Sequence, residues 1–195
     1  MTEADVNAVC NALGEMSMED VCSLKESNIR WMPDISSLTK PEAIRSIRNA
    51  VRSLDCTASR ASSIARLYCY LAEKNCLRLW RAYLLNERDL SGRFTLHQRL
   101  MAALANPGVS LAYEKVERDD AVYVVILSTY ADTSAPDNDV ICMCIPRTLP
   151  YVFVHCSRNG DGIKLVLGNV LVRSSLWFTD FQHLQEAFDY ALWKK

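Results

Sequence analysis

Apolar residues recur with helical spacing through the first hundred residues of the chain. In the first segment they follow the i, i+3, i+4, i+7 order that places side chains on one face of an α-helix: Val6, Val9, Cys10 and Leu13. Ser17 is expected to cap a second, short helix, because its hydroxyl can accept a hydrogen bond from a free backbone N–H and acids follow in the first turn. Further helices are expected to begin near Ser59 or Ser62, near Asn75 (burying Leu77, Trp80 and Leu84) and at Thr95.

The clearest helical pattern begins at Lys40-Pro41-Glu42, where proline suits the first turn and glutamate favours the positive end of the helix dipole. Its expected buried stripe consists of Ile44, Ile47, Val51 and Leu54. Arg45, Arg48 and Arg52 form a second stripe about a quarter-turn or more away, since each residue advances the helix by ~100°. This helix can therefore pack with one side and bind an anionic partner with another.

The pattern changes at Asn106-Pro107-Gly108, which is expected to end the helical part. The following segments are rich in β-branched and aromatic residues and are separated by turn formers. Four antiparallel strands are expected, over 109–116, 121–130, 140–145 and 151–156. A helix is expected over 180–193, while residues 163–172 fit a strand or a helix equally. The predicted fold class is therefore α+β, with a helical domain over 1–105 and a mainly antiparallel β-sheet domain with one or two helices over 106–195.

Charge is unevenly distributed, although the 195 residues have a net charge of only −1. Residues 1–34 contain 2 basic and 7 acidic side chains, residues 40–104 contain 12 and 5, and residues 105–195 contain 8 and 11. A basic middle third of this kind predicts a surface for an anionic partner, although solvated helix faces would give the same composition.

Candidate catalytic and metal-binding residues are few. The six glycines form neither G-x-G-x-x-G nor G-x-x-x-x-G-K, the loops that bind dinucleotides and phosphates. His155 and Cys156 would lie on opposite faces of a strand, and Asp119-Asp120 falls in a predicted turn. Cys142 and Cys144 share a face with His155 nearby and could in principle bind a metal, but reduced cysteines packed in a core are the preferred interpretation. We therefore expect no enzyme, metal or other cofactor; an enzyme using Cys/His chemistry is the least favoured alternative.

Membrane and secretory features are not expected either. No apolar run approaches the ~18–20 residues that span a bilayer, and the acidic N-terminal segment lacks the basic region of a signal peptide. The expectation is an intracellular, soluble protein with neither a membrane partner nor a small-molecule substrate.

Five segments, in this order, resemble the centromere protein N family of inner-kinetochore proteins: Met16–Val21, Leu79–Tyr83, Asn106–Val125, Thr148–Phe153 and Leu184–Trp193. The resemblance spans nearly the whole chain and lies in the order and spacing of the segments. It implies a pyrin-like (death-fold) helical bundle joined to a β-rich domain that is shared with centromere protein L. It also implies a role at the centromere and kinetochore in the nucleus. The implied partners are the nucleosome of the centromeric histone H3 variant, DNA, centromere protein L and other inner-kinetochore subunits.

The resemblance also implies site residues. Lys40 matches a basic DNA-holding position before the third helix of the family, and Arg45, Arg48 and Arg52 extend it. Glu3 matches an acidic position of a separate patch that reads the histone variant. The chain departs from the family's site residues at Asn7, Cys10, Asn11, Asn138, Asp139, Gln182 and Leu184. The expected function is nucleosome binding, in which lysine and arginine neutralise DNA phosphates without reading base sequence. The alternative is a death-fold-like protein-interaction module without DNA binding.

Overall fold

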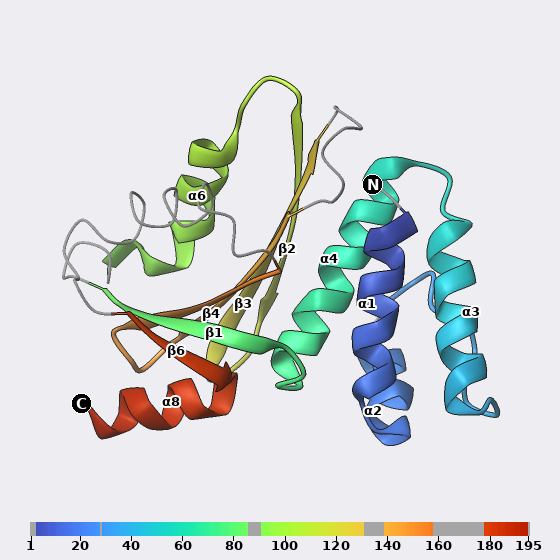
Figure 1. Ribbon diagram of the computed structural model, residues 1–195, viewed down its shortest axis with the longest axis horizontal. Coiled ribbons are helices and arrows are strands. Elements are labelled where there is room, and N and C mark those ends of the chain that lie inside the picture. The colour runs from blue at the N-terminus through green and yellow to red at the C-terminus, as the bar shows by residue number, and fades with distance from the viewer. Residues whose placement is uncertain (1–2, 28, 86–90, 131–138, 158–177, 195) are drawn as a thin grey trace.

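The fold is mixed α+β, as the sequence predicts (Figure 1). The computed structural model describes residues 3–27, 29–85, 91–130, 139–157 and 178–194. Within these residues the chain forms six α-helices and one six-stranded antiparallel sheet, with strands in the order β2-β3-β4-β5-β1-β6. The helices α1 to α4 gather on one side of the molecule, while α6 and α8 lie against the sheet (Figure 1). None of the described helices has the length and apolarity needed to cross a membrane.

Four helices form the N-terminal bundle: α1 (Glu3–Glu15), α2 (Met18–Ser23), α3 (Lys40–Arg52) and α4 (Thr57–Glu73). The predicted cap of α2 is confirmed, since Ser17 Oγ accepts a hydrogen bond from Asp20 N at 3.0 Å. At the start of α3, Glu42 Oε2 accepts a hydrogen bond from Thr39 N at 2.9 Å, which completes a capping box around Pro41. Helix α4 begins earlier than predicted, because the sulfur of Cys56 caps it by accepting from Ser59 N.

The helix predicted after Asn75 is wrong, because residues Arg78–Leu84 form strand β1. Asn75 adopts a left-handed conformation, with φ of 56°, and the following Cys76 N donates to Leu71 O at 2.8 Å, which ends α4. The spacing of Leu77, Trp80 and Leu84 mimics a helical face, but pairing with β5 and β6 imposes an alternating pattern. Trp80 is fully buried as a result, whereas Leu84 is exposed. The sheet therefore takes its first strand from before residue 106.

The four predicted strands are confirmed as β2 (Val109–Glu117), β3 (Ala121–Tyr130), β4 (Asp139–Pro146) and β5 (Tyr151–Cys156). A sixth strand, β6 (Phe178–His183), occupies the start of the helix predicted over 180–193, so that α8 covers only Leu184–Trp193. Helix α6 (Leu96–Leu104) is confirmed after a 3-10 turn, η2 (Arg93–Thr95); another, η1 (Leu24–Ser27), follows α2. The ambiguous segment 163–172 lies outside the described residues.

Each face of the sheet contributes to a separate apolar core. On one face, Trp80, Val125 and Phe153 pack with the α1–α4 bundle and with Ala187 of α8. On the other face, alternate residues such as Val124 pack with Leu100 of α6. Two-sided burial explains why β3 and β4 read as continuous apolar runs rather than as alternating ones.

Candidate functional site: a basic groove on helix α3

Many basic side chains of residues 40–104 are neutralised within the molecule. In the part of the chain that the structure describes, five of them form ion pairs: Arg52–Glu3, Arg66–Glu114, Lys74–Asp20, Arg78–Glu15 and Arg81–Asp180. All five acids lie outside residues 40–104, in the acidic first and last parts of the sequence. The excess of positive charge in the middle third is therefore much smaller in the fold than along the chain.

Three of the four basic residues predicted to hold DNA line one groove between α1 and α3. This α3 groove has a volume of about 500 Å³ and is lined by Gly14, Lys40, Pro41, Ile44, Arg45 and Arg48. No acidic residue is among them. Among the described residues, Lys40, Arg45 and Arg48 form no ion pair with any carboxylate. The groove is thus a local concentration of positive charge, and the acid of the described residues that interacts with it is the exposed Glu42, whose pKa is lowered mainly by hydrogen bonds from Thr39 and in small part by Arg45.

The helical repeat and a glycine together create the groove. Lys40, Ile44 and Arg48 are four residues apart, so they lie above one another on one face of α3. On α1, Gly14 has no side chain to fill the space in front of them, and a Cβ built there would lie 3.6 Å from Ile44 Cδ1. The sequence predicted the basic stripe on α3, but it gave no sign that Gly14 of another helix would form the opposite wall.

Arg48 has a buried polar atom, whereas Arg45 is exposed. The Arg48 side chain is half-buried, and its Nε is inaccessible to solvent without a hydrogen-bond partner in the structure. Arg48 lies beside the thiol of Cys10, whose pKa is raised by burial in spite of the opposing effect of this arginine. The thiol is therefore neutral at physiological pH and leaves the guanidinium charge uncompensated. A half-buried cation without a counterion favours binding of an anion from solution.

Arg52 and Glu3, which were predicted to belong to a DNA-binding site and a separate histone-binding site, form an ion pair with each other. Arg52 Nε donates to Glu3 Oε2 at 3.1 Å, and its Nη2 contacts Glu3 Oε1. Both side chains remain about half exposed. Arg52 does not line the α3 groove, so the structure groups the predicted residues as three groove cations plus one ion pair.

Of the other candidate residues, the cysteines are free thiols, and four of the eight are fully buried: Cys10, Cys69, Cys142 and Cys144. Burial raises the pKa of Cys69 to about 12 and that of Cys142 well above its ordinary value, so these thiols are protonated and poor nucleophiles. His155 is the cross-strand neighbour of Cys142, but its Nδ1 lies 2.6 Å from the carbonyl of Arg78. In the described part of the chain, no three His, Cys, Asp or Glu residues are arranged to hold a metal ion.

No protein-family model matches this sequence, and no curated protein matches it. Inferences about function therefore depend on the residues, their geometry and the five-segment resemblance.

Proposed function

We propose that this protein is an inner-kinetochore subunit of the centromere protein N type, and that it binds the DNA of the centromeric nucleosome through the α3 groove. The observation that supports DNA binding best is the set of three groove cations, Lys40, Arg45 and Arg48, which form no ion pair among the described residues. The kinetochore assignment, and with it centromere protein L as a partner and the nucleus as the location, is supported by the order of the five resembling segments. We also infer that α1 to α4 form a pyrin-like bundle.

The groove favours binding of the phosphate backbone rather than base recognition. Lysine and arginine side chains release counterions when they neutralise phosphates, and this gives affinity for any sequence. Three phosphate contacts predict that log K falls with log salt concentration with a slope of about −2.7. A near-zero slope would contradict an electrostatic site.

The proposal is tested with two triple variants of equal charge. The groove variant Lys40→Gln/Arg45→Gln/Arg48→Gln removes the three cations, and the control Arg30→Gln/Lys194→Gln/Lys195→Gln removes three cations from elsewhere in the chain. Binding to a fluorescent duplex and to nucleosomes is measured by gel shift and anisotropy across a salt series. The groove variant should lose most of the affinity and of the salt slope, whereas the control should bind like the unmodified protein. Equal losses in both variants would show a general charge effect and would refute the groove.

Recognition of the histone variant is a separate part of the proposal. Nucleosomes with the centromeric H3 variant and nucleosomes with ordinary H3 are compared on the same DNA. Equal affinity for the two would leave DNA binding intact but would remove the histone-reading role implied for Glu3. Failure to bind either nucleosomes or duplex would leave the alternative, a bundle that docks acidic protein segments.

A further inference from the structure

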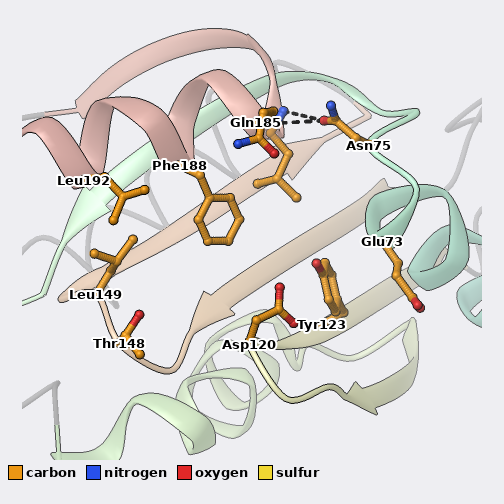
Figure 2. A pocket seen from close by; sticks show the side chains of 10 residues that line it. Glu73, Asn75, Asp120, Tyr123, Thr148, Leu149, Gln185, Phe188 and Leu192 are labelled. Carbon is orange, nitrogen blue, oxygen red and sulfur yellow. Dashed lines mark hydrogen bonds between the residues drawn. The ribbon is translucent and has the colours of Figure 1, made fainter.

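A second concave site lies between α8, the end of α4 and two turns of the sheet (Figure 2). This α8 pocket has a volume of about 430 Å³. Its apolar lining consists of Leu149, Leu184, Phe188 and Leu192, and its polar lining consists of Glu73, Asn75, Asp120, Tyr123, Thr148 and Gln185. In Figure 2, the Asp120 carboxylate and the Tyr123 hydroxyl point into the space beneath α8. The volume is within the range of about 300–1,000 Å³ that is typical of ligand sites.

The walls of the α8 pocket are held in place by contacts from distant segments. Asn75 Oδ1, at the end of α4, accepts hydrogen bonds from Leu184 N at 2.9 Å and from Gln185 N at 3.3 Å, which caps α8 (Figure 2). The Phe188 ring packs on Phe153 of β5, with centroids 4.8 Å apart. The pocket is therefore part of the folded frame and does not depend on a single surface loop.

Asp120 provides the uncompensated charge of this pocket. The other acid, Glu73, accepts from Arg118 through both carboxylate oxygens, at 2.9 Å each, and its side chain points away from the centre (Figure 2). None of the described residues that line the pocket is basic. Within the described part of the chain, the carboxylate of Asp120 has no hydrogen-bond or ion-pair partner. Burial raises the pKa of the Tyr123 phenol, so its hydroxyl is neutral and can accept a further hydrogen bond.

We propose that the α8 pocket receives an arginine or lysine side chain of a partner protein. The cation would pair with Asp120, and the Tyr123 and Thr148 hydroxyls would accept its remaining hydrogen bonds. The aliphatic stem would lie against Phe188 and Leu149, as long basic side chains do on apolar surfaces.

A protein segment fits this site better than a free amine does. Leu192 is 58% exposed at the rim and Trp193 next to it is 77% exposed, so apolar surface continues outward along α8. Such surface is covered well by an apolar residue next to the basic one. The site is also remote from α3, which lies at the opposite side of the molecule (Figure 1). The α8 pocket is therefore independent of the proposed DNA-binding groove.

The test is a 1H–15N NMR titration of the full chain with acetyl-Leu-Arg-Leu-amide and with the same peptide containing citrulline, which keeps the shape but removes the charge. Saturable shifts are expected at Asp120, Gln185 and the Asn75 side-chain amide. The arginine peptide should bind about five-fold more tightly than the citrulline peptide, as one solvent-accessible ion pair allows. Asp120→Asn should abolish this preference. Asp119→Asn, which removes the same charge one residue away and outside the pocket lining, should keep it.

A further variant reports on the apolar wall. Leu192→Ala truncates a largely exposed side chain, so the fold should be unaffected and both peptides should bind more weakly. The proposal would be overturned if the two peptides bound equally, or if the two aspartate variants behaved alike. It would also be overturned if about 10 mM peptide, ten times a dissociation constant of about 1 mM, caused no saturable shifts in the pocket.

Discussion

Replacing Glu3 by glutamine tests whether this acid competes with DNA for Arg52. The two side chains form an exposed ion pair between the first turn of α1 and the last turn of α3. An exposed pair of this kind contributes at most about 1 kcal/mol to stability, so Glu3→Gln should leave the protein folded. Arg52 is one turn beyond Arg48 on the same helix, about 6 Å along the axis at 1.5 Å per residue. The freed guanidinium would therefore extend the α3 groove by a fourth cation.

The size of the effect follows from counterion release. One additional phosphate contact makes the salt slope more negative by about 0.9. Between about 50 and 200 mM salt, a four-fold change, the advantage of Glu3→Gln over the unmodified protein should shrink about 3.5-fold. The assay is fluorescence anisotropy of a labelled duplex over this range of salt. Arg52→Gln should gain no affinity, because it leaves the Glu3 carboxylate unpaired beside the groove, where it repels phosphates.

A double-mutant cycle decides between the explanations. Glu3→Gln/Arg52→Gln should lack the gain of Glu3→Gln and should bind DNA like the unmodified protein, because the gain requires the freed arginine. A Glu3→Gln protein with unchanged affinity and slope would refute the competition. A loss of affinity in Arg52→Gln that the double variant does not recover would show that Arg52 reaches the phosphates even with Glu3 present.

Three further predictions concern stability, measured by urea unfolding. Asn75→Ala should cost about 2 kcal/mol, because it removes the cap of α8 and puts alanine, which tolerates the left-handed region less well than asparagine, at φ of 56°; Asn75→Gly also removes the cap but relieves the left-handed conformation, and should cost roughly half as much. Gly14→Ala should stabilise the protein by about 0.5 kcal/mol, because alanine is the better helix former in the last turn of α1 and the added methyl would meet Ile44 at an ordinary contact distance of 3.6 Å. Burial lowers the pKa of His155, so the unfolded chain binds more protons in mild acid. Stability should therefore be full above the unfolded value of about 6.5 and should fall as the pH drops below it, and His155→Gln should reduce this dependence.

The sequence predicts those helices and strands whose apolar pattern is contained within the element itself. Helix α3 and its basic stripe were predicted because the spacing, the proline and the capping glutamate are all within 13 residues. Strand β1 was not predicted, because its seven residues fit two periodicities and the choice is made by pairing with β5, some seventy residues later. Long-range pairing, rather than local propensity, determined this element.

The candidate sites show the same division. The three groove cations are on one helix, so the sequence could group them, whereas the Arg52–Glu3 pair joins residues 49 positions apart. The α8 pocket combines the turn between β2 and β3, the end of α4 and helix α8. The sequence indicates only a turn at Asp120. Charge along the sequence could not show which cations are neutralised, because the five acids that pair with the middle third come from both flanks.

The ion pairs within the molecule determine which parts of its surface keep an unpaired charge. With five basic residues neutralised, the proposed affinity for DNA would depend on the three cations of the α3 groove more than on the total number of basic residues. At the other side of the molecule the sign is reversed, since the carboxylate of Asp120 has no ion-pair partner among the described residues. A nucleosome offers both complementary chemistries, DNA phosphates and basic histone side chains. If the α8 pocket contacts histones, Asp120→Asn should weaken binding to nucleosomes and leave binding to free duplex unchanged, whereas the groove variant should weaken both. Loss of duplex binding in Asp120→Asn would contradict this division, and unchanged nucleosome binding would assign the α8 pocket to another protein partner.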